Sequence, residues 1–213
     1  MKISWLNRTN NQNLIVFFNG WGMDDEIVTH LDSSGFDIIT ICDYRDFEFD
    51  YKSCDCDFEK YSEKYLICWS MGVYVSNLFK KLFDNFDKKI AVAGTNRIID
   101  NNFGILEKIY NVTIKYFSDE SAKKFIDNIF LNENHSFKIK RSTSELKDEL
   151  ISLKNLEIEH ELNYNKAIIP TKDIIVPFRN QINYWESMNI KSIQINAPHY
   201  VFGKFKSWQE IIC

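Results

Sequence analysis

The sequence predicts an α/β fold: one domain built on a mostly parallel sheet that is flanked by helices. Continuous apolar runs such as residues 14–18 have the composition of strands that are buried on both faces. The segments between successive runs carry apolar residues at helical spacing. A helix between two strands provides the crossover that a parallel sheet needs. Residues 96–165 depart from this alternation and predict a helical insertion.

Each predicted strand is a short apolar run bounded by polar residues, and many asparagines supply the turns between elements. The predicted strands are, in chain order, residues 14–18, 37–42, 65–68, 89–94, 166–170 and 191–195. The segments between or after them that we expect to be helical are residues 24–31, 73–83, 178–188 and 201–212.

The insertion carries amphipathic patterns typical of helices, at residues 121–130 and 144–156. A stretch of this length without a strand is too long for a loop in a compact domain. We therefore expect residues 96–165 to form a helical cap, or lid, over one edge of the sheet. Residues 1–95 and 166–213 are then expected to form the core.

Composition excludes several classes of protein. The net charge of −4 and the pI of about 5.6 disfavour a large nucleic-acid-binding surface. No apolar run approaches the roughly 18 residues of a membrane-spanning helix, and residues 1–13 lack the apolar run of a signal peptide. The five cysteines suit reduced thiols in the cytoplasm. Cys54 and Cys56 have no second Cys or His pair nearby, so we expect no zinc site.

Ser70 lies where a buried strand meets a helix, in the stretch YLICWSMGVYVSN at residues 65–77. One interpretation is a helix N-cap. The other is a nucleophile elbow, a tight strand-to-helix turn that exposes the serine and needs small residues on both sides. Gly72 provides one small residue, and Cys68 stands where the usual G-x-S-x-G pattern has its first glycine.

A nucleophilic serine needs a base and an orienting carboxylate, which in this architecture follow in the order serine, acid, histidine. His199 comes after the last predicted strand and Asp173 after the preceding one. Both therefore lie past the carboxyl edge of the sheet, where open α/β sheets build their sites. Asp43 is the rival acid. The alternatives are a loop histidine hydrogen-bonded to backbone at position 199 and a solvated turn aspartate at position 173.

The loop after the first buried strand reads FNGWGM at residues 18–23. Its two glycines let the backbone approach a ligand and direct an N–H group at an oxyanion. The N–H of Met71, directly after Ser70, is the expected second donor. The rings of Trp21 and Trp69 are expected to line a pocket wall or the core.

The motifs FFNGWGMD, CWSMGV, DIIVPFRNQINYW and PHY together resemble the BioG-type pimeloyl-[acyl-carrier protein] methyl ester esterases, α/β-hydrolases of biotin synthesis. The resemblance implies Ser70 as nucleophile, Asp173 as acid and His199 as base. It also implies that the N–H groups of Trp21 and Met71 hold the oxyanion, with Trp21, Trp69 and Met71 contacting substrate. Asn19 replaces the histidine that related BioH-type esterases carry in the first loop.

The resemblance implies hydrolysis of the methyl ester of pimeloyl-acyl-carrier protein (pimeloyl-ACP) to pimeloyl-ACP and methanol, without a metal or an organic cofactor. The implied partner is the acyl carrier protein. Two alternatives stay open: another serine esterase or thioesterase with the same residues, and a non-catalytic relative that only binds a ligand.

A carrier protein is strongly acidic, so an enzyme of net negative charge needs a local basic patch to attract it. Residues 108–141 carry seven basic and four acidic side chains, and residues 142–161 reverse that balance with two and six. A solvated mixed surface is the simpler interpretation. The residues predicted to meet the carrier are Lys123, Lys124, Lys138, Lys140 and Arg141.

Overall fold

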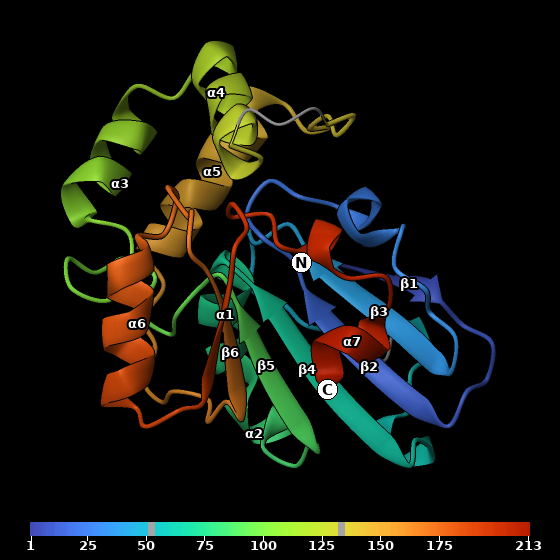
Figure 1. The fold of residues 1–213 in the computed structure, drawn as a ribbon. Helices are drawn as coiled ribbons and strands as arrows, with labels where there is room; N and C mark the ends of the chain where they lie inside the picture. The colour runs from blue at the N-terminus through green and yellow to red at the C-terminus, as the bar shows by residue number, and fades with distance from the viewer. Residues whose placement is uncertain (51–53, 132–134) are drawn as a thin grey trace.

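The computed structural model describes residues 1–50, 54–131 and 135–213, and Figure 1 shows their arrangement around a single sheet. The strand order is β1-β3-β2-β4-β5-β6-β7. All neighbours pair in parallel except β1 and β3, which are antiparallel. The strands are β1 (Lys2–Asn7), β2 (Asn13–Phe18), β3 (Phe36–Cys42), β4 (Glu63–Trp69), β5 (Lys88–Val92), β6 (Lys166–Pro170) and β7 (Ser192–Ile195).

The six predicted strands are confirmed as β2 to β7, within one or two residues at their ends. Strand β1 was not predicted. Among the described strands it lies at the edge of the sheet beside β3, and none of its residues is fully buried. It therefore lacks the continuous apolar run that marks the inner strands.

The two faces of the sheet form two hydrophobic clusters. Leu14, Val16 and Phe18 of β2 point into one cluster, whereas Ile15 and Phe17 point into the other. This alternation follows from the period of two in a strand. Because both faces are covered, β2 needs apolar residues at every position, as its sequence predicts.

The helix predicted at residues 73–83 is divided into α1 (Met71–Val75), the 3₁₀ turn η4 (Ser76–Phe79) and α2 (Lys80–Phe83). The side chain of Asn77 explains the division. Its Nδ2 donates to the backbone oxygens of Val73 and Tyr74, at 3.0 and 2.8 Å. A side chain that takes the carbonyls of the preceding turn competes with the helical ladder.

The predicted helix at residues 201–212 is wrong over its middle. The chain instead forms η5 (Phe202–Lys204) and then α7 (Trp208–Ile212). Ser207 is extended and its Oγ accepts from the N–H of Glu210, so a new helix begins there. Helix α6 (Phe178–Ser187) matches its prediction, and the segment at residues 24–31 forms the short η1 (Asp25–Val28).

Residues 96–165 contain α3 (Glu107–Lys115), α4 (Asp119–Ile129) and α5 (Thr143–Lys154). Figure 1 shows these helices grouped beyond the end of the sheet from which α1 starts. Helices α4 and α5 match the two predicted amphipathic segments. Helix α3 was not predicted individually, and it leaves Ile109, Val112 and the adjoining Tyr116 about half exposed, at 55%, 47% and 64%.

Candidate active site

Ser70 has the backbone of a strained turn, with φ 54° and ψ −120°. A non-glycine residue at positive φ is costly and is held there only by its surroundings. Its N–H donates to the backbone oxygen of Val92 at 2.9 Å, which extends the β4–β5 pairing to the turn. Its side chain makes no capping hydrogen bond to α1. The geometry therefore matches a nucleophile elbow and not an N-cap.

Two glycines let the chain pass close to this turn. A Cβ atom on Gly72 would lie 2.5 Å from the backbone oxygen of Phe18 and 2.7 Å from that of Asn19. A Cβ on Gly94 would lie 2.6 Å from the backbone oxygen of Ser70. Gly72 was predicted from the elbow pattern, whereas Gly94, at the end of the next strand, was missed.

Cys68 occupies the small position before Ser70 and is fully buried. Burial raises the pKa of its thiol to about 12, opposed by hydrogen bonding to Tyr164 and Ser76. The thiol is therefore protonated at neutral pH and packs as a small apolar side chain.

Ser70, His199 and Asp173 form one hydrogen-bonded row. Nε2 of His199 lies 2.9 Å from Oγ of Ser70, and Nδ1 lies 2.8 Å from Oδ2 of Asp173. All three side chains are buried. The carboxylate can only accept, so Nδ1 carries the ring proton and Nε2 is left to accept the serine hydroxyl. The structure thus brings together the three residues predicted from chain order.

The rival acid, Asp43, lies elsewhere. Its carboxylate accepts from Arg45 at 2.7 Å and faces Arg141 at 3.0 Å. The hydrogen bond from Arg45 lowers the pKa of Asp43, with Arg141 adding to the effect. Asp43 is thus an ion-pair partner at the end of β3, and Asp173 is the carboxylate that meets His199.

The loop after β2 is stabilised by its own asparagine. Asn19 is fully buried; its Oδ1 accepts from the N–H of Gly20 at 3.0 Å and its Nδ2 donates to the backbone oxygen of Asp24 at 2.9 Å. Gly22 has φ 75°, a conformation that favours glycine. The side-chain amide of Asn19 therefore closes this loop, at the position where the BioH-type esterases are expected to carry a histidine.

Helix α5 also holds the same loop. The indole N–H of Trp21 donates to the backbone oxygen of Leu146 at 3.0 Å. Glu149, fully buried, accepts from the backbone N–H of Tyr44 at 2.7 Å, and the hydroxyl of Tyr44 donates to the backbone oxygen of Asn19 at 2.7 Å. Two separate connections thus join α5 to the loop that carries Trp21.

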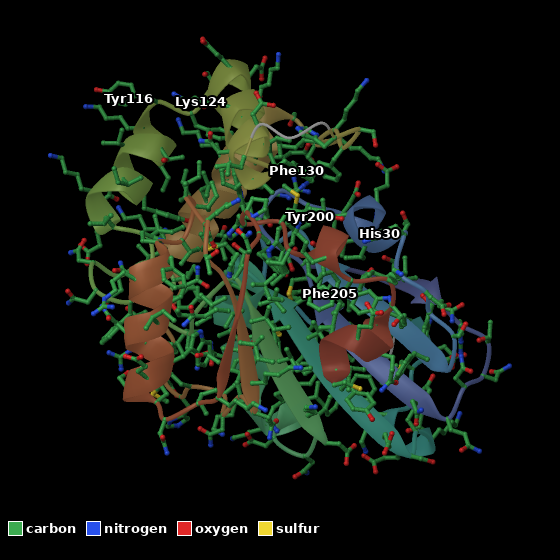
Figure 2. All side chains as sticks on the ribbon, in the orientation of Figure 1. His30, Tyr116, Lys124, Phe130, Tyr200 and Phe205 are labelled. Carbon is green, nitrogen blue, oxygen red and sulfur yellow. The ribbon has the colours of Figure 1, made fainter. Side chains whose placement is uncertain are left out.

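An apolar cavity of about 360 Å³ opens from Ser70. Trp21 and Met71 line it together with Ser70, and residues of α3, α4 and α5 complete its walls. Tyr116 and Lys124 also line it, and Figure 2 shows both at the end of the molecule farthest from the sheet. The cavity has the composition of a site for an apolar chain with few polar contacts.

Trp69 does not line this cavity, which corrects the expected substrate contact. It is fully buried in the opposite cluster from Cys68, because successive strand residues point to opposite faces. Its indole N–H donates to the backbone oxygen of His199 at 3.2 Å, and the two rings lie 5.5 Å apart. Trp69 therefore holds the backbone of His199 by a hydrogen bond and packs against its ring.

The predicted carrier-binding residues separate into two groups. Arg141 pairs with the buried Glu149 at 2.6 Å and with Asp43 at 3.0 Å, and Lys140 pairs with Glu26 at 2.7 Å. These two cations are engaged within the chain, and Arg141 is largely buried. The remaining three are Lys124 in the cavity wall, and Lys123 and Lys138 beside a second hollow next to α4.

Gln181 of α6 is a site residue that was not predicted. It is fully buried, and its Nε2 donates to Oδ2 of Asp173 at 2.9 Å. A buried amide eight residues after the acid leaves no local pattern in a sequence. Within residues 1–50, 54–131 and 135–213, no group of three His, Cys, Asp or Glu side chains could hold a metal ion. No helix in the same ranges is long and apolar enough to cross a membrane.

A family model described as "Pimeloyl-ACP methyl esterase BioG" matches residues 1–211. The chain belongs to this family. The crystal structure of BioG from Haemophilus influenzae superposes with a TM-score of 0.83 at 26% identity and covers 100% of both chains. A Bacteroides fragilis protein named malonyl-[acyl-carrier protein] O-methyltransferase is 29% identical over 198 residues, which is 87% of this chain and 39% of that protein.

The fold is the α/β-hydrolase fold. An esterase from Exiguobacterium antarcticum superposes with a TM-score of 0.66 at 14% identity, covering 92% of this chain and 87% of that one. At this identity the likeness concerns the fold alone. Family membership, together with this fold, supports a carboxylic ester hydrolase that uses a serine.

Proposed function

We propose that the chain hydrolyses the methyl ester of pimeloyl-acyl-carrier protein, with Ser70 as nucleophile, His199 as base and Asp173 as orienting acid. The observation that carries the proposal is the hydrogen-bonded row of these three residues, of which Ser70 lines an apolar cavity. The name of the matching family supplies the substrate.

In the first half-reaction, Oγ of Ser70 attacks the ester carbonyl while Nε2 of His199 takes the hydroxyl proton. Asp173 stabilises the imidazolium that forms. The tetrahedral intermediate collapses when the C–O bond to methanol breaks, and His199 returns the proton to the leaving oxygen. In the second half, water attacks the acyl-enzyme with the same proton relay, which releases the free carboxylate and restores Ser70.

The N–H groups of Trp21 and Met71 are the proposed donors to the oxyanion. Both residues line the cavity beside Ser70, and Met71 is the first residue of α1. The loss of one such donor in a serine hydrolase lowers turnover by roughly 10²–10³-fold. The two connections from α5 to the Trp21 loop hold one of these donors in place.

The carrier is proposed to dock beside α4, at Lys123, Lys124 and Lys138. Their ammonium groups suit the phosphate of a prosthetic arm and the acidic surface of a carrier, and such steering needs only a local patch. Arg141 and Lys140 are left out of this proposal because their charges already have partners in the chain.

Ser70→Ala tests the chemistry. We expect the rate of methyl pimeloyl-ACP hydrolysis to fall by at least about 10³-fold, because alanine lacks the nucleophilic hydroxyl. A fluorophosphonate probe should label the native chain at Ser70 and leave the variant unlabelled. Ser76→Ala, which removes another buried serine hydroxyl, is the matched control and should keep a nearly native rate. Hydrolysis by a correctly folded Ser70→Ala variant would disprove the assignment.

Substrate choice needs a second comparison. The double variant Lys123→Glu/Lys138→Glu should raise KM for the carrier-bound ester and leave hydrolysis of a small free methyl ester unchanged. Lys191→Glu, an exposed lysine beside β7, is the control for charge reversal alone. Equal loss on both esters would indicate damaged folding. Faster hydrolysis of a short-chain thioester than of methyl pimeloyl-ACP would favour a thioesterase.

A further inference from the structure

The amide of Gln181 makes two hydrogen bonds beside the site. It lies in the first turn of α6, and its Nε2 donates to Oδ2 of Asp173 at 2.9 Å and to the backbone oxygen of Val176 at 2.8 Å. Both of its N–H donors are therefore used. The reversed amide would turn its oxygen towards two acceptors, so the orientation is determined by its neighbours.

The carboxylate of Asp173 accepts four hydrogen bonds, which matches its capacity of about four lone-pair sites. Oδ1 accepts from the backbone N–H groups of Ile175 and Val176, at 2.8 and 3.0 Å. Oδ2 accepts from Gln181 and from Nδ1 of His199, at 2.9 and 2.8 Å. Three of the four donors belong to the turn and helix after β6, and the fourth is His199.

Gln181 and His199 therefore share one oxygen atom. The backbone donors hold Oδ1, but small coupled changes of the χ1 and χ2 angles of Asp173 can still tilt the carboxylate and displace Oδ2. The amide of Gln181 restrains this displacement at the second oxygen, and it does so from a side chain that is itself fully buried. It is also absent from the cavity wall, so it has no part in holding an acyl chain.

We propose that Gln181 is a positioning residue for His199, acting through Asp173. Its hydrogen bond keeps Oδ2 in the position from which it accepts the Nδ1 proton. This keeps Nε2 unprotonated and directed at Ser70 and stabilises the imidazolium once the serine proton has moved. The inference rests on the proposed serine mechanism and adds a fourth residue to the row.

Gln181→Met is the direct test, because methionine has a similar length and no N–H donor. We expect kcat to fall on the order of 10- to 100-fold, as for the loss of a hydrogen bond to a charged group. KM should stay within about twofold, since Gln181 does not touch the cavity. The rate of fluorophosphonate labelling should fall by the same factor as kcat, because both reactions need an activated Ser70.

Asn180→Leu is the matched control. The neighbouring amide also lies in α6, but its Nδ2 donates to the backbone oxygens of Gly104 and Asn101, at 2.8 and 3.3 Å, and not to Asp173. This variant should keep the native kcat even if its Tm decreases. A purely structural role for Gln181 would make the two variants behave alike.

A double-mutant cycle with Asp173→Asn separates positioning from general stability. If Gln181 acts through Asp173, then Gln181→Met should cost much less in the Asp173→Asn background than in the native chain. Equal costs in both backgrounds would overturn the inference, as would native kcat and labelling in Gln181→Met. A native chain that the probe does not label at Ser70 would instead disprove the proposed function.

Gln181→Glu provides a second variant of nearly the same shape. Its protonated form can still donate to Asp173, whereas its ionised form places two carboxylates together. Its kcat relative to the native chain should therefore fall as pH rises. A ratio that rises as pH rises would overturn the inference, even if Gln181→Met failed to fold.

Discussion

Gly72→Ala is the sharpest test of the elbow geometry, because a single methyl group meets a rigid obstacle. The new Cβ would lie 2.5 and 2.7 Å from the backbone oxygens of Phe18 and Asn19. Neither oxygen belongs to a flexible side chain. The carbonyl of Asn19 also accepts from the hydroxyl of Tyr44, so it cannot turn away without losing that bond.

The size of the effect follows from the displacement. A Cβ atom tolerates a neighbouring heavy atom at 3.0–3.4 Å, so the new Cβ and the backbone oxygen of Phe18 must separate by roughly 0.5–0.9 Å. The shift moves Ser70 relative to the loop that carries the N–H of Trp21. A misplacement of about 1 Å costs on the order of 10²-fold in rate. Overpacking lowers the free energy of unfolding by about 1–3 kcal/mol. This corresponds to a decrease in Tm of roughly 2–12 °C in a chain of this size.

The assay compares kcat/KM on a methyl ester with Tm for Gly72→Ala and for a matched glycine. Gly203→Ala would bring its Cβ no closer than 3.4 Å to the ring of Tyr200, an ordinary contact. We expect Gly203→Ala to stay near native in both measurements. Native activity and Tm in Gly72→Ala would refute the crowding explanation.

Three further predictions concern single side chains. Asp173→Asn should lower kcat by about 10⁴-fold, by analogy with the same change in trypsin, while Asp43→Asn should change kcat only a few-fold; the reverse ranking would move the acid to β3. Iodoacetamide at pH 8 should leave the enzyme active, because the thiol of Cys68 is buried with its pKa raised to about 12; inactivation with label on Cys68 would contradict this. Burial raises the pKa of Glu149 above its ordinary value of 4.5, so the folded chain binds this proton more tightly than the unfolded chain. The contribution of Glu149 to stability therefore decreases as pH rises from the ordinary pKa through the raised one. Glu149→Gln removes this dependence, so the Tm advantage of the native chain should be larger at pH 4.5 than at pH 7; a constant difference would show that Glu149 does not titrate there.

Much of the core was predictable because its signals are local. Strand β2 is apolar at nearly every position, and such a run indicates burial on both faces. The three residues of the hydrogen-bonded row follow strand ends, and parallel strands bring their carboxyl ends to one edge. Chain order and these positions therefore predict that Ser70, Asp173 and His199 lie close together.

Other features depend on contacts that a sequence does not display. The sequence predicts Arg141 as a surface charge, but Glu149 and Asp43 pair with it inside the fold. Lys140 likewise meets Glu26, which is distant in the chain. The face of Trp69 could have been predicted, since strand alternation places it opposite its neighbour Cys68. The break between η5 and α7 depends on the cap at Ser207, which outweighed the apolar periodicity around it.

The connections from α5 to the Trp21 loop affect how the insertion could be engineered. Helices at the mouth of such an enzyme are natural targets for exchange between relatives, to alter the acyl group that is accepted. In this chain a transplanted α5 without a carboxylate at position 149 would leave Nη2 of Arg141 and the N–H of Tyr44 without their acceptor. It would also remove one of the two connections that hold the loop carrying Trp21. A successful chimera would therefore have to carry Glu149, Arg141 and Tyr44 together as one unit.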